Sequence, residues 1–178
     1  MVIVREEGVS SSSSGGIYDV FLSFRCADVG KTFADHLHSA LCNGFRIFRL
    51  NENVERGKTI KSELQKAIKE SRMSIVVFSK GYASSRRCLD ELEMILQHKT
   101  SSGGHHVLPI FYDVDPSDVR RQMGSFKEAF ERYEEGEREG ERENKGKSRV
   151  KCWKAALTKA ANLAGMHLQN DANGNSIS

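Results

Sequence analysis

The chain has 178 residues, of which 38% are hydrophobic and 29% are charged, and its formal net charge is +3. That length fits one domain with its own hydrophobic core. The small charge excess gives no argument for a nucleic-acid or membrane partner, and no apolar run is long enough to span a bilayer. The four cysteines contain no Cys-x-x-Cys pair. They argue against a disulfide framework or a zinc site and favour a reducing compartment.

The two ends of the chain differ in composition from its centre. Residues 1–16 end in five serines and two glycines, and residues 169–178 are polar. Segments of this kind bury too little apolar surface to offset the entropy lost on ordering. We therefore predict a disordered leader at 1–16, one domain at 17–168 and a disordered tail at 169–178.

Between these ends, strand patterns alternate with helical patterns. Aromatic and β-branched residues predict strands, in chain order, at 17–25, 45–48, 73–78 and 107–112. Amphipathic helices are predicted to follow them near Phe33, Ile60, Leu89 and Pro116, with a last helix near Trp153. Such alternation favours a parallel sheet covered on both faces. Its ligand site would lie outside the carboxyl ends of the strands, in the loops at 23–32, 49–59, 79–87 and 112–118.

Three local signals refine these helices. Ser84 or Ser85 is expected to cap the helix near Leu89, and Asp115 the helix that begins at Pro116. This second helix is expected to continue through Phe130. In the segment 131–151, fourteen of 21 residues are charged, seven of each sign. We interpret that segment as a solvated, partly frayed helix or loop.

Several common sites are excluded by spacing. Gly57-Lys58-Thr59 resembles the end of a phosphate-binding P-loop, but Glu52 stands where that motif needs a glycine, and no Gly-x-Gly-x-x-Gly occurs. The pairs His36/His38 and His105/His106 lack metal-ligand spacing, so we interpret them as surface residues and predict no metal site.

Six segments together resemble the plant Toll/interleukin-1 receptor (TIR) domain, which opens one class of intracellular immune receptors, the TIR-type disease-resistance proteins. These segments are Ile17–Arg25, Glu55–Gly57, Cys88–Leu92, Leu108–Arg120, Trp153–Leu157 and Ala161–Gly165. The resemblance runs from about Tyr18 to Leu168. It implies a flavodoxin-like, three-layer α/β fold with a short parallel sheet of four to five strands.

The resemblance also implies an activity, because many members cleave NAD at the nicotinamide–ribose bond to give ADP-ribose or cyclic ADP-ribose. NAD is then the substrate, and no further cofactor is required. The motif match places the family's catalytic glutamate at Glu91. It places the NAD pocket at Gly57, at Arg87 and at the loop comprising Arg25, Cys26, Ala27, Asp28, Val29 and Gly30. Backbone amides and an arginine near a helix start suit phosphate binding.

Helix geometry alone gives a simpler interpretation of the same residues. Glu91 flanks the apolar face of its helix, as a solvated boundary glutamate would, and Asp90 and Glu93 are interpreted as surface charges. Arg87 lies four residues before Glu91, so the two can pair. We hypothesise that this pair keeps Glu91 ionised but partly occupied, so that Arg87→Trp raises NAD turnover.

The chain departs from the family pattern in its expected pocket. Cys26 and Ala27 stand where members usually have glycine and glutamate, Gly30 where they have arginine, and Arg87 where they have tryptophan. These departures support an alternative function as a catalytically silent interaction module. Flavin binding, a third possibility by analogy of fold, receives little weight.

Both main functions imply self-association and contact with other TIR proteins. The resemblance places the contacts at Asp35 and His36, at the last helix and at the loop 49–59. It implies a cytoplasmic location, with an additional nuclear pool left open.

Overall fold

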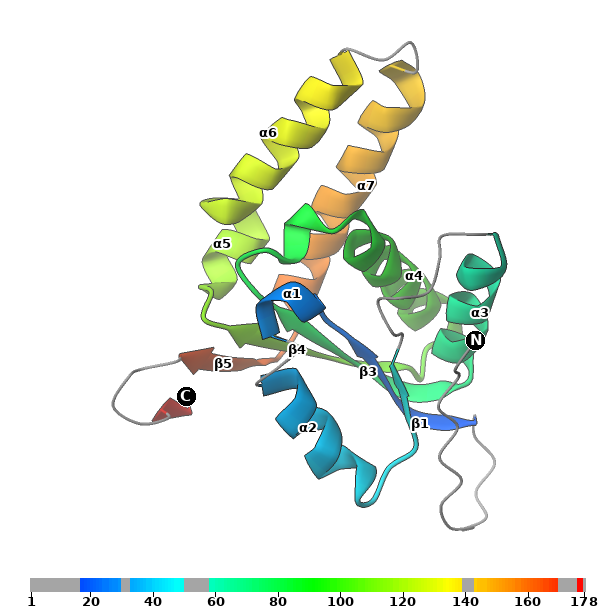
Figure 1. The fold of residues 1–178 in the computed structure, drawn as a ribbon. Helices are drawn as coiled ribbons and strands as arrows, with labels where there is room; N and C mark the ends of the chain where they lie inside the picture. The colour runs from blue at the N-terminus through cyan, green and yellow to red at the C-terminus, as the bar shows by residue number, and fades with distance from the viewer. Residues whose placement is uncertain (1–16, 30–32, 50–57, 139–142, 170–175, 178) are drawn as a thin grey trace.

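The computed structural model describes residues 17–29, 33–49, 58–138, 143–169 and 176–177. Its centre is one sheet of strand order β2-β1-β3-β4-β5-β6 (Figure 1). The strands are β1 (Tyr18–Ser23), β2 (Ile47–Arg49), β3 (Ser71–Phe78), β4 (His106–Tyr112), β5 (Met166–Gln169) and β6 (Ser176–Ile177). The first five strands pair in parallel, whereas β6 is antiparallel to β5. The predicted flavodoxin-like α/β architecture is confirmed.

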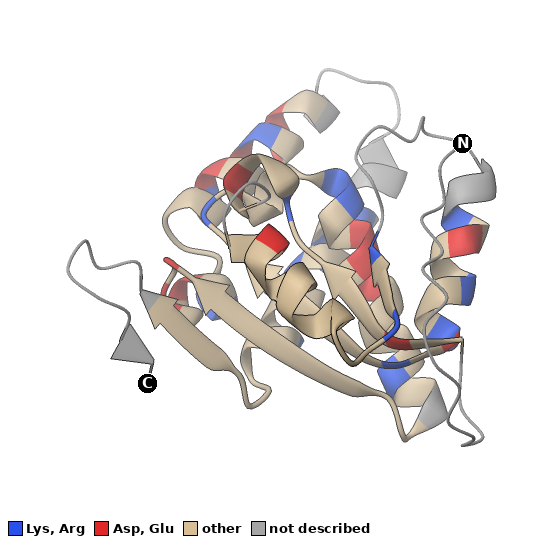
Figure 2. Ribbon diagram, turned by 60° about the horizontal axis from the view of Figure 1, so that its bottom comes forward, with Lys and Arg blue, Asp and Glu red and all other residues tan. Residues whose placement is uncertain are grey.

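Helices cover both faces of the sheet, but unequally. The helices are α1 (Cys26–Val29), α2 (Phe33–Cys42), α3 (Lys58–Lys69), α4 (Arg86–Ser102), α5 (Pro116–Arg121), α6 (Ser125–Arg138) and α7 (Glu143–Ala161), with a 3-10 turn η1 (Tyr82–Ser84) before α4. In Figure 1, α2 lies on one side of the sheet, and α3, α4 and α7 lie on the other. Figure 2 shows that charged residues lie mostly along the helices, whereas the strands carry few. No helix within the described ranges is both long and apolar enough to cross a membrane.

The alternation of side chains along the strands divides the core between these two faces. Phe21 and Val76 pack in the larger cluster with α4 and α7, whereas Val20, Leu22 and Val77 pack in the smaller cluster with α1 and α2. Period-two alternation sends successive side chains to opposite faces. Ser23 follows Phe21 by two positions, so it lies on the face that α4 covers.

Two strands at the carboxyl end of the chain were not placed by sequence. Residues 166–169 form β5 beside β4, and Ser176–Ile177 pair with Leu168 and Gln169. Within the expected disordered tail, Gln169 and Ser176–Ile177 therefore lie in strands, while residues 170–175 and 178 and the predicted leader 1–16 lie outside the described residues. The β5 segment has four residues and one of them is His167, so its apolar signal is weak.

The helix expected from Pro116 through Phe130 is two helices. Its N-cap is as predicted, because the Asp115 side chain accepts from the Ser117 N–H at 2.7 Å. However, α5 ends at Arg121, and Gln122 adopts a left-handed conformation with φ of 51°. The Gln122 side chain donates to the carbonyls of Val119 and Arg120, which satisfies acceptors that a continuing helix would have used.

The charged segment 131–151 is helical on both sides of residues 139–142, which lie outside the described residues. Figure 1 shows α6 and α7 extending together away from the sheet. Their packing is not purely solvated, because Val150 is buried in the core. Lys154 also pairs with Glu134 of α6 at 2.7 Å.

Candidate functional site

Glu91 lies in the second turn of α4, at the carboxyl edge of the sheet. The helix begins where predicted, with the Ser85 side chain accepting from the Cys88 N–H at 3.3 Å. Leu89, Leu92 and Ile95 face the sheet and are fully buried. Glu91 itself is only 3% exposed, so its interpretation as a solvated boundary glutamate is wrong. The reason is that η1 and the end of β1 cover the helix at this point.

Two groups hold the Glu91 carboxylate. The Ser23 hydroxyl, at the end of β1, donates to Oε2 at 2.8 Å. Nε of Arg87 lies 3.4 Å from Oε1, which confirms the predicted pair. Behind Ser23, the buried Tyr82 hydroxyl lies 3.3 Å from Ser23 Oγ and donates to the Cys88 carbonyl at 3.0 Å. A carboxylate in this setting is fixed in position by three elements of the fold.

Burial dominates the titration of Glu91. Loss of hydration raises its pKa from 4.5 to about 7, although the Arg87 charge and the Ser23 hydrogen bond both lower it. Arg87 thus favours the ionised form of Glu91, as expected, but burial acts against it and has the larger effect. The Cys88 thiol and the Tyr82 hydroxyl stay protonated, because burial raises the pKa of Cys88 to about 12 and that of Tyr82 well above 10.

A second polar group forms at the same edge around Asp28 of α1. Its carboxylate accepts from Ser79 Oγ at 2.6 Å and from the Gly81 N–H at 2.7 Å, and it pairs with Arg25. These contacts join the loop after β1 to the loop after β3. A Cβ on Gly81 would overlap Arg25 Nη1 and lie 2.6 Å from Asp28 Oδ2, so a larger residue here would displace the Arg25–Asp28 pair.

The predicted pocket residues do not all meet. Glu91 pairs with Arg87, and Arg25 pairs with Asp28. The other predicted positions differ in exposure: Cys26 is half-buried, Ala27 is exposed and Val29 is buried in the core beside α2. Gly30, Gly57 and most of the predicted loop 49–59 lie outside the described residues.

Sequence reasoning missed Ser23, Tyr82 and Ser79. Ser23 and Ser79 carried a usable signal, since each is a hydroxyl residue at the end of an apolar strand pattern, on the edge where parallel sheets place ligands. Tyr82 gave no comparable signal, because a single tyrosine in the loop after β3 does not reveal which carbonyl it will reach.

Two more interpretations from sequence are corrected. Asp90 is not a simple surface charge, because it accepts from Trp153 Nε1 at 2.9 Å and from Arg149 Nε at 3.2 Å. His105 is not a surface histidine. It is 5% exposed, and it lies between the Ser71 carbonyl at 3.1 Å and Ser74 Oγ at 2.8 Å. Among the described residues, no three potential ligands gather into a metal site.

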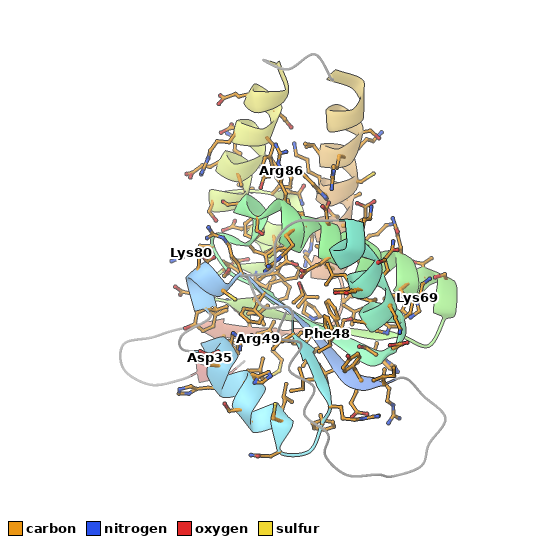
Figure 3. The ribbon with its side chains drawn as sticks, turned by 45° about the vertical axis from the view of Figure 1, so that its right-hand side comes forward. Asp35, Phe48, Arg49, Lys69, Lys80 and Arg86 are labelled. Atoms are coloured by element: carbon orange, nitrogen blue, oxygen red, sulfur yellow. The ribbon has the colours of Figure 1, made fainter. Side chains whose placement is uncertain are left out.

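The regions expected to mediate self-association are connected within the chain. Arg49, the last residue of β2, donates to Asp35 of α2 at 2.8 Å (Figure 3). Its guanidinium also lies 4.8 Å from the centre of the Phe24 ring. The end of β2 is thereby tied to α2 and to the residue that follows β1.

Comparison with known proteins places this geometry in context. A family model described as the TIR domain matches residues 17–177, and so continues beyond residue 168. Disease resistance protein RPV1 of Vitis rotundifolia is 51% identical over 168 residues, covering 91% of this chain and 11% of that protein. TMV resistance protein N of Nicotiana glutinosa is 50% identical over 157 residues, covering 88% of this chain and 13% of that protein. The chain thus spans only a small part of these relatives.

A similar fold occurs in a solved structure. It is that of the TIR domains of the activated Roq1 resistosome, which directly recognizes the pathogen effector XopQ. The TM-score is 0.73 at 47% sequence identity, and the match covers 88% of this chain and 91% of that one.

Proposed function

This chain belongs to the TIR-domain family and resembles the TIR domains of plant disease-resistance proteins, and we propose that it cleaves NAD at the bond between nicotinamide and ribose. In this proposal Glu91 is the catalytic carboxylate. The observation that carries it is a glutamate 3% exposed at the carboxyl edge of the sheet, held by Ser23 and Arg87. Structural glutamates are rarely buried in this way.

The reaction suits a single carboxylate. The C–N bond breaks with its electron pair going to the nicotinamide ring, which is cationic before cleavage and leaves neutral, so no general acid is needed. The ribose carbon gains positive charge, which an ionised Glu91 stabilises. Water then adds to that carbon and loses a proton to solvent, giving ADP-ribose. Attack by the adenine ring instead gives the cyclic product. NAD is the substrate, and no separate cofactor takes part.

We propose further that self-association controls access. A carboxylate this buried must become reachable before NAD can approach it. The solved TIR domains that resemble this chain belong to an activated resistosome. Contacts through Asp35, His36, α7 and the loop 49–59 would act on the segments that surround the site, since Arg49 already links β2 to Asp35.

A silent interaction module is the second candidate function, and one observation favours it. Both arginines of the predicted pocket have partners inside the chain: Arg87 pairs with Glu91, and Arg25 pairs with Asp28. In such a module these pairs would persist after assembly, and the domain would only recruit partners.

Nicotinamide release from NAD separates the two functions. The assay uses concentrated protein with a crowding agent that promotes assembly, and it compares the wild type with Glu91→Gln. Glu93→Gln is the matched control, because Glu93 lies on the same helix and its partner Gln97 is exposed. We expect release by the wild type and the control but at least a hundredfold less by Glu91→Gln. No release by a folded, assembled wild type would support the silent module.

A further inference from the structure

Glu91 stands at one end of a row of hydrogen-bonding groups that crosses the site, called the hydroxyl chain because the Ser23 and Tyr82 hydroxyls form its middle. Oε2 lies 2.8 Å from Ser23 Oγ, Ser23 Oγ lies 3.3 Å from the Tyr82 hydroxyl, and that hydroxyl lies 3.0 Å from the Cys88 carbonyl. All four residues are buried. The chain ends in an acceptor, since a carbonyl has no proton to donate.

The number of protons decides which form of Glu91 this chain favours. Three contacts need three protons. If Glu91 is ionised, Ser23 and Tyr82 supply only two, so one contact lacks a hydrogen bond. If Glu91 is neutral and the Ser23 hydroxyl turns from Oε2 to Tyr82, all three contacts are satisfied: Glu91 donates to Ser23, Ser23 to Tyr82, and Tyr82 to the Cys88 carbonyl. Unsatisfied polar contacts are costly in a buried network.

We propose that Ser23 and Tyr82 are positioning residues that hold Glu91 as the neutral acid while the site is closed. When the site opens, Glu91 releases its proton to water, and the Ser23 hydroxyl turns to donate to Oε2. The carboxylate then carries the negative charge that the developing ribose cation requires. This inference rests on the proposed function, and it adds a reason why the closed domain does not consume NAD.

The surrounding charges oppose one another. On α4, Arg87 favours the ionised form of Glu91 and Asp90 disfavours it. Tyr82 and Cys88 remain neutral, and the charge of Arg25, which follows β1, reaches Cys88. The raised pKa of Glu91, about 7, shows that Arg87 does not outweigh burial. A Ser23 hydroxyl that donates to Oε2 lowers the pKa of Glu91. The hydroxyl chain acts in the same direction as burial only when the Ser23 proton turns to Tyr82, because all three contacts are then satisfied by the neutral acid.

A double-mutant cycle tests the chain through the pKa of Glu91. We would follow the side-chain carboxyl by ¹³C NMR in the isolated 178-residue protein, with its signal assigned by its loss in Glu91→Gln. Tyr82→Phe keeps the ring but removes the proton that completes the neutral chain. The ratio of ionised to neutral Glu91 at a fixed pH should therefore rise roughly two- to tenfold, the effect of one hydrogen bond.

Tyr82→Phe should have no effect on the pKa of Glu91 when the row of hydrogen-bonded hydroxyl groups is interrupted at Ser23. In a Ser23→Ala background, Tyr82→Phe should leave the pKa of Glu91 unchanged, whereas a packing effect of the tyrosine would persist. Tyr133→Phe is the matched control, because Tyr133 donates to the Ala83 carbonyl of η1 at 3.0 Å without contacting Ser23. It should leave the pKa of Glu91 at its wild-type value.

Three results would overturn the inference: a wild-type Glu91 that titrates near 4.5, a pKa that Tyr82→Phe leaves unchanged, or an equal shift in both backgrounds. Nicotinamide release separates this failure from failure of the proposed function. The predicted shifts in a protein that releases no nicotinamide would overturn the function alone. Glu91-dependent release without the shifts would overturn the hydroxyl chain alone.

Discussion

Trp153 of α7 donates its indole N–H to the carboxylate of Asp90 on α4 across 2.9 Å, one residue before Glu91. Arg149 also pairs with Asp90, and its guanidinium lies 5.2 Å from the centre of the Trp153 ring. Long-range contacts of this kind fix one helix against another. Helix α7 therefore anchors the turn of α4 that carries the candidate catalytic carboxylate.

Loss of the indole donor should weaken this anchor. Trp153→Phe keeps an aromatic ring in the core but removes the bond to Asp90, so the free energy of unfolding should fall by about 1–2 kcal/mol. Urea denaturation would measure the change. In an Asp90→Ala background, which removes the acceptor, the same substitution should cost less, and equal costs in the two backgrounds would contradict the anchoring role.

Stability should depend on pH through Glu91. Its pKa is about 7 in the folded protein against 4.5 when solvated, so between these values the folded state binds more protons than the unfolded state. Stability therefore falls as pH rises through this window, by up to roughly 3 kcal/mol. Glu91→Gln removes that loss. It should raise the free energy of unfolding relative to wild type at pH 8 more than at pH 4.5, and an equal difference at both would argue against a buried, titrating Glu91.

His105 should have the opposite pH dependence. Nδ1 faces the Ser71 carbonyl, which can only accept, so Nδ1 carries the proton and Nε2 accepts from Ser74. Burial, together with the smaller effects of the His98, Lys99 and His106 charges, lowers the pKa of His105 from 6.5 to about 4, although the hydrogen bond to the Ser71 carbonyl raises it. Below pH 6.5 the unfolded chain binds a proton that the folded chain does not.

The protein should therefore lose about 1–2 kcal/mol of stability through His105 between pH 7 and pH 5. His105→Gln should lower stability at pH 7 because it disrupts this packing, but it should flatten the loss between pH 7 and pH 5. Thermal melts of both proteins at the two pH values measure the difference. A variant as sensitive to acid as the wild type would rule out His105 as the titrating group.

Two glycines should respond oppositely to alanine. A Cβ on Gly165 would lie 2.5 Å from the Pro109 carbonyl oxygen, which belongs to the backbone of β4. Gly165→Ala should therefore cost more than about 2 kcal/mol. A Cβ on Gly136 of α6 meets nothing within 4 Å, so Gly136→Ala should stabilise by about 0.5–1 kcal/mol. Destabilisation by both would indicate that α6 is not helical at this position.

The alternation of strands and helices was predictable because each apolar pattern matches the period of its element. The caps at Ser85 and Asp115 were predictable for a similar reason, since they depend on residues three or fewer positions away. The break at Gln122 was not, because its left-handed conformation and side-chain bonds to two carbonyls leave no periodic signal. Strand β5 was not predictable either, because four residues are too few to show a periodic pattern.

The candidate site likewise has features that the sequence predicts and features that it does not. Pairing of Arg87 with Glu91 followed from their spacing on one helix. The burial of Glu91 did not, because its cover comes from Ser23, which is 68 positions away in the chain, and from Tyr82. Sequence spacing predicts which residues can meet along one helix. The pKa of a carboxylate depends instead on every group that excludes water from it, including groups far away in the sequence.

The pH dependence of nicotinamide release by the assembled wild type tests the central claim most directly. If an ionised Glu91 stabilises the ribose cation, kcat/KM should rise with pH, roughly tenfold per pH unit below the pKa of Glu91, and level off above it. Opening hydrates the carboxylate, so in the assembled protein this pKa should lie between 4.5 and about 7, the value raised by burial. Glu93→Gln should follow the same curve, and Glu91→Gln should show no such rise. Release that is independent of pH across this range, or that falls as pH rises, would contradict Glu91 as the catalytic carboxylate.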